Sequence, residues 1–135
     1  MSAGADAAAS FRAAIERGDI DAASELLAPD IVFHSPVTFH PFLGRETVVG
    51  LLEQVAQVFQ DFRYTDELQA GDAHALIFRA TVGDREVEGV DLLRFDEQGL
   101  ICDFTVMLRP LSGLIPFAQE MGERAAGAGL QTTRR

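Results

Sequence analysis

The clearest pattern in the chain is a helical repeat of apolar residues in its first half. It advances in steps of three or four residues over Val48, Leu51, Leu52, Val55, Val58 and Phe59. Such steps place all six side chains on one face of a helix. Because Gly44-Arg45-Glu46 opens this segment, the sequence predicts its longest helix from there to Phe59.

Two shorter helices are predicted before it, arranged as a hairpin. The first carries an apolar repeat of Phe11, Ala14 and Ile15. It is expected to end at Gly18, since glycine tolerates the backbone of a helix end. Asp19 is a suitable N-cap for the second helix, which should stop before Pro29. The apolar stripe of that helix is Ala22, Ala23, Leu26 and Leu27.

Strand patterns dominate the rest of the chain. Residues 31–33 are a β-rich run that Ser35-Pro36 ends, and residues 37–43 are expected to be a loop. Residues 62–108 read as successive antiparallel strands, with turn signals at Gly71-Asp72, Gly83-Asp84 and residues 96–99. A short closing helix is predicted after Arg109-Pro110, with Leu114, Phe117, Ala118 and Met121 on its apolar face.

This order of elements predicts the α+β class, with a curved antiparallel sheet wrapped on the long helix and the helical hairpin beside it. The length of 135 residues, with 47% hydrophobic and 24% charged residues, suits one globular domain. We expect that domain to span residues 1–125, followed by a flexible tail over residues 126–135.

The net charge limits the classes of binding partner, and the hydropathy and cysteine content bear on where the protein is found. The net charge of −10 disfavours nucleic acid and anionic membranes, because phosphate groups would be repelled. No apolar run approaches the roughly 18 residues of a transmembrane helix, and the N-terminus lacks the pattern of a signal peptide. The single cysteine, Cys102, cannot form an internal disulfide. A cytoplasmic protein is therefore expected.

Strand alternation singles out one carboxylate. If Asp91 points inward, its inward neighbours are Val87, Gly89, Leu93 and Phe95, which are apolar or lack a side chain. Burial among such residues would raise the pKa of Asp91 and suit it to act as an acid or base near neutral pH. The alternative is a structural carboxylate that is held by a hydroxyl, a water or the backbone.

The same alternation predicts the wall of a mainly apolar pocket. The expected ligand-binding residues are Phe11, Ser35, Leu52, Phe59, Phe78, Phe104, Val106 and Leu108. Cys102 is expected on the same inward face of the last strand. The outward face of three strands carries Ile77, Thr81, Val90, Leu92, Thr105 and Met107. No helix remains to cover that face, so a homodimer through it is expected.

Other polar residues have weaker patterns. His40, on the loop, is the candidate catalytic partner of Asp91. Strand alternation would also allow His74 an inward position, but His74 lies beside a turn and is expected in solvent. Tyr64 either packs within its strand or offers its hydroxyl to the pocket. The sequence has neither clustered metal-ligating residues nor a Gly-rich phosphate loop, so no metal and no cofactor are expected.

The order of elements and several short motifs resemble the nuclear transport factor 2-like superfamily, in particular its SnoaL-like polyketide cyclases and ketosteroid isomerases. The resemblance covers about residues 8–110. Its motifs are Gly18-Asp19-Ile20, Pro29-Asp30, Gly44-Arg45-Glu46 and the segment from Val90 to Gly99. It implies a cone-shaped, cystatin-like fold, described also as an α+β barrel, around a pocket and usually assembled as a homodimer.

The ketosteroid isomerases allow a comparison by residue. Their catalytic base matches Ser35, their helix-one tyrosine matches Phe11, and only their second carboxyl matches in kind, as Asp91. Ser35 is too weak a base, and Phe11 cannot donate a hydrogen bond, so that mechanism is disfavoured.

Three functions stay open. The leading one is a SnoaL-like protein that binds a small, mostly apolar oxygenated molecule, polyketide-, terpenoid- or steroid-like, with cofactor-free isomerase or cyclase chemistry at Asp91. The alternative is a non-catalytic ligand-binding or assembly module. A limonene-epoxide type of hydrolase is a weaker third, because it requires a second carboxylate and an arginine.

Overall fold

One curved sheet and the helices around it form the structure, a computed structural model that describes residues 3–128. The helices are α1 (Ala3–Glu16), α2 (Ile20–Ser24), α3 (Arg45–Val58) and α4 (Leu111–Ala128). The strands are β1 (Leu27–His34), β2 (Phe42–Leu43), β3 (Gln60–Ala70), β4 (Ala73–Val82), β5 (Arg85–Phe95) and β6 (Ile101–Arg109). None of the helices within the described residues is long and apolar enough to cross a membrane.

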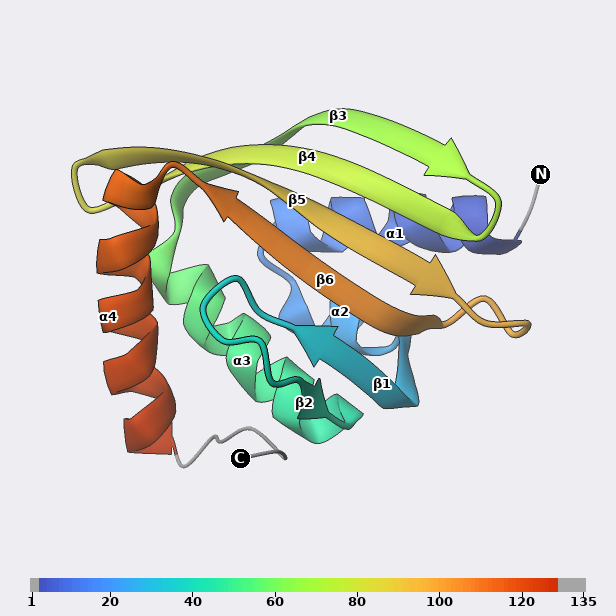
Figure 1. Cartoon of the computed structure of the whole chain (residues 1–135). Helices are drawn as coiled ribbons and strands as arrows, with labels where there is room; N and C mark the ends of the chain where they lie inside the picture. The colour runs from blue at the N-terminus through green and yellow to red at the C-terminus, as the bar shows by residue number, and fades with distance from the viewer. Residues whose placement is uncertain (1–2, 129–135) are drawn as a thin grey trace.

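The strands lie in the order β2-β1-β6-β5-β4-β3, and the sheet curves without closing (Figure 1). Neighbouring strands are antiparallel except β1 and β6, which run parallel. The antiparallel hairpins expected over residues 62–108 are present, and the antiparallel arrangement fails only where β1 joins β6. The cause is the long connection between them, because α3 and the hairpins of β3 to β6 return the chain to β1 in the same direction.

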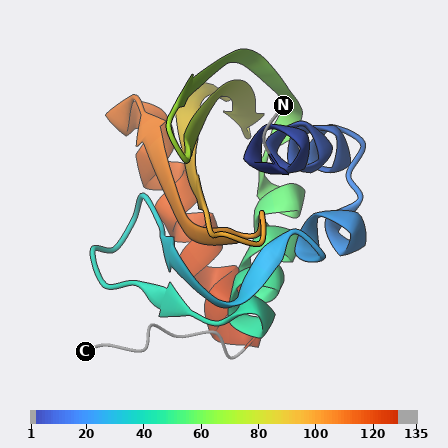
Figure 2. The same ribbon diagram turned by 90° about the vertical axis from the view of Figure 1, so that its right-hand side faces the viewer.

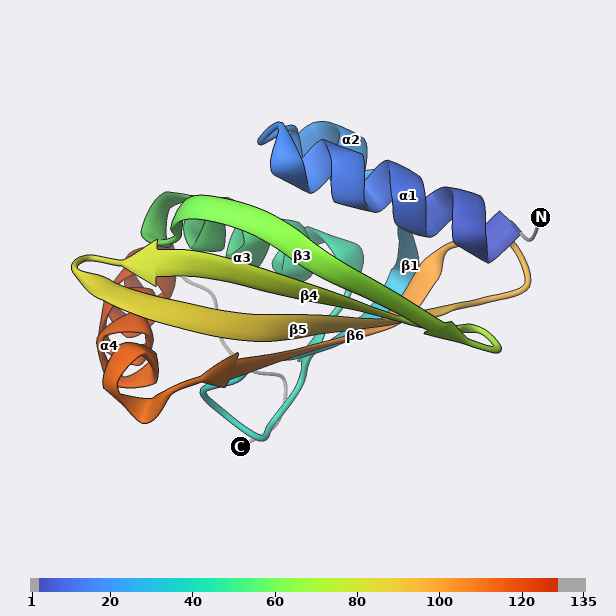
Figure 3. The ribbon, with the colours of Figure 1, turned by 90° about the horizontal axis from the view of Figure 1, so that it is seen from above.

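The helices enclose the concave side of the sheet. Seen along the strands, the sheet curls around α1 and α3 (Figure 2). Seen from above, α1 and α2 lie beside one part of the sheet, whereas α4 lies near its opposite end (Figure 3). There α4 packs on β4, β5, β6 and α3. The α+β class and the curved sheet wrapped on helices are confirmed.

Two sets of side-chain hydrogen bonds to the backbone position α2, β1 and α3. The Asp19 carboxylate accepts a hydrogen bond from the N–H of Ala22 at 3.0 Å, which caps α2 as expected. Arg45, in the first turn of α3, donates through Nε and Nη2 to the Leu27 carbonyl at 3.0 and 2.8 Å. This forked contact joins the start of α3 to the start of β1.

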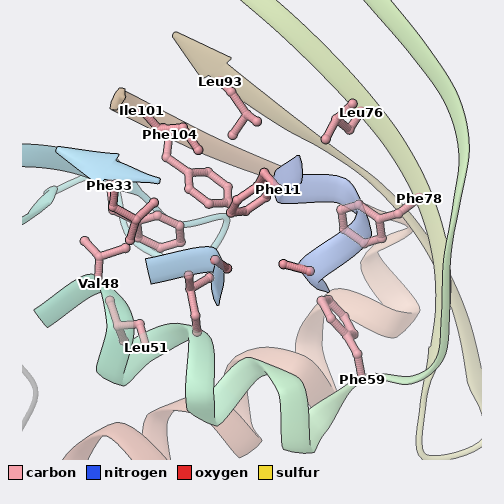
Figure 4. Close-up of a cluster of buried hydrophobic side chains, with 14 of the residues drawn as sticks. Phe11, Phe33, Val48, Leu51, Phe59, Leu76, Phe78, Leu93, Ile101 and Phe104 are labelled. Carbon is pink, nitrogen blue, oxygen red and sulfur yellow. The ribbon is translucent and has the colours of Figure 1, made fainter. Parts of the chain in front are cut away.

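Aromatic rings fill the space between the layers (Figure 4). Phe11 from α1 and Phe33 from β1 both approach Phe104 of β6 edge-on, with ring centroids 5.5 and 5.1 Å apart. Phe59, which follows α3, stacks on Phe117 of α4 at 5.0 Å. Edge-on and stacked pairs add to the free energy gained by burial. These contacts tie α1 to the sheet and α4 to the end of α3.

Several boundaries differ from the sequence prediction. α2 ends at Ser24, so Leu27 belongs to β1, and the expected loop over residues 37–43 contains the short strand β2. α4 has 18 residues and is longer than α3, which has 14, because the alanine-rich sequence after Met121 favours continued helix. Of the expected tail, residues 126–128 lie in α4, and residues 129–135 lie outside the described residues.

Candidate functional site

The helices and the concave face of the sheet enclose a cavity of about 500 Å³. Of the eight expected ligand-binding residues, seven line it, namely Phe11, Ser35, Leu52, Phe59, Phe78, Phe104 and Val106. Leu108 does not line the cavity and packs, half-buried, against the hydrophobic core. A volume of this size and an apolar wall are typical of sites for small organic ligands.

Asp91 and Tyr64 form the polar centre of this wall. Both side chains are only 6% exposed, and the Tyr64 hydroxyl donates to Asp91 Oδ2 at 2.7 Å. Asp91 comes from β5 and Tyr64 from β3, so their contact crosses the intervening strand β4 on the concave face. Within the described part of the chain, no protein group donates to the second oxygen, Oδ1. The second oxygen is therefore available to a molecule in the cavity.

Burial determines the protonation of this pair. It raises the pKa of Asp91 to about 7, and the hydrogen bond from Tyr64 lowers it only in part. Burial also raises the pKa of Tyr64 well above its usual value, and the nearby negative charge of Asp91 adds to that effect. At neutral pH the carboxyl group therefore exists in both forms, while the phenol keeps its proton. Such a carboxyl can both accept and donate a proton.

Charged residues reach the cavity only at its mouth. Among the described residues that line it, the other charged ones are Glu16 and Arg17 at the end of α1, and both are exposed. Arg17 pairs with Asp19 at 3.4 Å. Arginine is thus present at the entrance, although the sequence indicated no basic residue in the wall. The interior remains apolar apart from Asp91 and the hydroxyl groups.

The histidines lie away from Asp91. His40 is half-exposed outside the cavity lining, and its N–H donates to Thr38 Oγ1 at 3.4 Å. His34 points to the convex side of the sheet, where it contacts Asp103 at 3.2 Å. The expectation that His74 is in solvent is wrong. It is 2% exposed and packs edge-on against Phe95, because β4 already begins at Ala73 and gives His74 the inward parity.

The family model of the SnoaL-like domain matches residues 8–104. The chain belongs to the SnoaL-like family. The expected nuclear transport factor 2-like superfamily is thereby confirmed. No curated protein matches the sequence significantly.

Solved structures agree with the SnoaL-like assignment. A steroid delta-isomerase from Pseudomonas aeruginosa is 40% identical, with 97% of each chain covered and a TM-score of 0.90. An uncharacterised bacterial protein with a cystatin-like fold from Silicibacter pomeroyi is 33% identical, covering 91% of this chain and 87% of its own, with a TM-score of 0.87. An NTF2-like protein of unknown function from Mesorhizobium loti is 24% identical, covering 80% of this chain and 92% of its own, with a TM-score of 0.71. It shares the fold.

Two positions of this SnoaL-like chain escaped simple alternation. The ladder between β3 and β4 shifts register on both sides of Tyr64, so counting along β3 does not tell which way that side chain points. A further shift opposite Arg94 turns Ile101 inward and leaves Cys102 half-exposed, outside the cavity lining. The expected inward position of Cys102 is therefore wrong. β-Bulges of this kind reverse the faces of the residues beyond them.

Ser35 lines the cavity but is used by its own loop. Its hydroxyl oxygen accepts hydrogen bonds from the N–H groups of Val37 and Thr38, each at 3.2 Å. These bonds hold the loop after β1 against the mouth of the cavity. Ser35 therefore stabilises the loop that forms this part of the cavity wall.

Proposed function

We propose that this chain binds a small, mainly apolar carbonyl compound, polyketide-, terpenoid- or steroid-like, and exchanges a proton with it at Asp91. The observation that carries the proposal is the single buried carboxylate in an apolar cavity, with Oδ2 held by Tyr64 and Oδ1 free. A pKa of about 7 supports the role, because both protonation states are then populated at neutral pH. The steroid delta-isomerase among the similar structures supports the same class of ligand.

The proposed step is proton transfer next to a carbonyl group. Oδ1 of ionised Asp91 takes a proton from the carbon beside the carbonyl, and the electron pair moves onto the carbonyl oxygen to form an enolate. The protonated carboxyl then returns the proton to the same or another carbon, which completes the exchange or an isomerisation. Phe11 and Ser35 supply neither an oxyanion donor nor a second base, so Asp91 performs both halves of the transfer.

The first arm of the test measures binding. We expect neutral steroid enones and polyketide-like diketones to raise the melting temperature of the protein. Sugar phosphates should not, because none of the described basic side chains lies in the cavity interior and Arg17 at the mouth is already paired. Stabilisation by the sugar phosphates alone would contradict the proposed ligand class.

The second arm measures proton transfer. In deuterium oxide, the protein should accelerate deuterium incorporation beside the carbonyl of a bound compound, as measured by mass spectrometry. Asp91→Asn should lower this rate by about two orders of magnitude or more, a usual contribution of a general base. The matched control is Asp84→Asn, because the Asp84 side chain is almost fully exposed. Binding without exchange in the wild type would overturn the catalytic proposal and favour a non-catalytic binding module.

We also propose that the convex face of the sheet forms a homodimer. Val90 lies between Ile77 and Met107 in the register of the central strands, and Met107 is 52% exposed. Ion pairs of Glu88 with Arg79 and Arg109 border this apolar row. An apolar centre with a charged rim is typical of protein interfaces.

Sedimentation tests the dimer. At micromolar concentration the wild type should sediment at twice the 14.7 kDa of one chain. Leu92→Glu on the convex face should give the monomer, because it buries an unpaired charge in the interface. The control is Ile115→Glu on α4, where Ile115 is exposed and the helix lies on the concave side of the sheet, and it should leave the dimer intact. A monomeric wild type would refute the proposal.

A further inference from the structure

Tyr64 lies on an edge strand whose hydrogen-bonded pairing with the sheet is irregular on both sides of it. β3 is an edge of the sheet, hydrogen-bonded to β4 alone, and Tyr64 is its one buried residue. The register shifts on both sides of Tyr64, between Gln60 and Arg63 and between Tyr64 and Asp66, so only two consecutive residues of β3 pair regularly with β4 at this point. Because the ladder is irregular at this point, other contacts must fix the position of the hydroxyl on Asp91.

The rings of Phe62 and Phe78 pack edge-on against Tyr64, and the polar contacts come from α1. Glu16 Oε2 accepts a hydrogen bond from the N–H of Tyr64 at 3.4 Å. The guanidinium carbon of Arg12 lies 5.7 Å from the centroid of the Tyr64 ring, within the range of a cation–π contact. Arg12 also pairs with Glu16 at 3.6 Å and with Glu67 of β3 at 3.3 Å. One guanidinium group therefore joins α1 to β3 and covers the ring of Tyr64.

Arg12 also balances the negative charges around the phenol. Glu16 and Asp91 raise the pKa of Tyr64, and Arg12 acts in the opposite direction. The Arg12 side chain is 33% exposed, so water weakens its ion pairs only in part. Without Arg12, the carboxylates of Glu16 and Glu67 would lose the cation that they share.

We infer that Arg12 is a positioning residue that, together with Glu16, holds the Tyr64 hydroxyl on Asp91. The inference rests on the proposed function, in which Asp91 exchanges the proton. Arg12 touches no ligand in this role and acts only through Tyr64. Its loss should loosen the donor bond from Tyr64, and a weaker donor leaves the ionised form of Asp91 less stable.

The sequence itself supplies the probe. The chain has one tyrosine and no tryptophan, so its near-ultraviolet tyrosine absorbance reports Tyr64 alone. Ionisation of Asp91 changes the charge at the acceptor of the phenol and should shift that absorbance. Recording it against pH in the full-length protein gives the midpoint at which Asp91 titrates, with no substrate present.

We expect Arg12→Gln to move this midpoint upward by about half a pH unit or more. The matched control is Arg79→Gln, which removes the same charge from an ion pair on the opposite face of the sheet. Arg79→Gln should leave the midpoint within error of the wild type. Equal midpoints for the two variants would overturn the inference.

Arg12→Lys separates position from charge. Lysine keeps the positive charge but cannot reach both Glu16 and Glu67 with a planar fork. If the midpoint of Arg12→Lys lies between those of the wild type and Arg12→Gln, the result supports a positioning role for Arg12. If Arg12→Lys has the wild-type midpoint, the positive charge alone is sufficient and the inference is overturned. Because the absorbance needs no turnover, a protein that lacks exchange activity would still decide the role of Arg12.

Discussion

Above pH 7, Asp91→Asn is expected to melt at a higher temperature than the wild type, and near pH 4 the two proteins should melt alike. The fold raises the pKa of Asp91 from 3.8 to about 7 and so favours its protonated form. The stability that this provides is complete below the unfolded pKa and is lost as the pH rises through the folded pKa. The raised pKa corresponds to a loss of about 4 kcal/mol at most. Asparagine stays neutral and still accepts the hydrogen bond from Tyr64.

Melting curves of the wild type, Asp91→Asn and the surface control Asp84→Asn between about pH 4 and pH 9 test this expectation. The difference between the wild type and Asp91→Asn should grow with pH and level off above the folded pKa, whereas the control should follow the wild type. If Asp91→Asn were instead less stable at every pH, Asp91 would be a structural carboxylate that the protein binds in its ionised form. The proposed acid–base role would then lose its physical basis.

Gly89→Ala is expected to lower the free energy of unfolding by about 2 to 3 kcal/mol and to abolish binding in the cavity. A Cβ at this position of β5 would overlap the ring of Phe78, its partner in β4, and would lie 2.6 Å from the carbonyl oxygen of Met107. The backbone of β6 cannot retreat without breaking the ladder. Phe78, which lines the cavity, would therefore have to move inward and occupy part of it.

The matched control is Gly127→Ala in α4, where a Cβ would meet nothing within 4 Å and which does not line the cavity. It should be neutral or stabilising by up to about 1 kcal/mol, because alanine favours helix over glycine. Urea unfolding and ligand-induced melting shifts should be measured for both variants. Equal stability of Gly89→Ala and the wild type would show that the Phe78 ring has another place to go.

Strand alternation predicted the inward side of the central strands well. β4 and β5 pair without a break from Ala73 to Val82, so counting in twos along them is valid. That is why the inward position of Asp91 follows from the sequence. Its apolar neighbours on the same face, Gly89 and Leu93, are buried as well. The repeat in residues 48–59 was equally clear, because helix α3 packs one continuous face on the core.

The positions of Tyr64, Pro29 and His40 could not be predicted, because they depend on contacts and irregularities that form only in the folded chain. Tyr64 was left open because bulges interrupt β3 on both sides of it, and a bulge leaves no simple mark in a pattern of apolar residues. Pro29 suggested a break, but it lies inside β1 where the register with β6 shifts, and proline is tolerated at such irregular positions. The place of His40 follows from loop hydrogen bonds that only the folded chain makes.

The parallel pairing of β1 with β6 determines which part of the sheet can form early during synthesis of the chain and which part forms late. His34 and Asp103, which meet across this pair, are 69 residues apart in sequence. The hairpins from β3 to β6 close over short loops and β1 can pair with the nearby β2, whereas β1 reaches β6 only after β6 has left the ribosome. Closing such a long loop is costly in entropy and slow compared with hairpin formation. The β1–β2 pair therefore remains separate from the larger part of the sheet until β6 has been made, and the cavity is completed last.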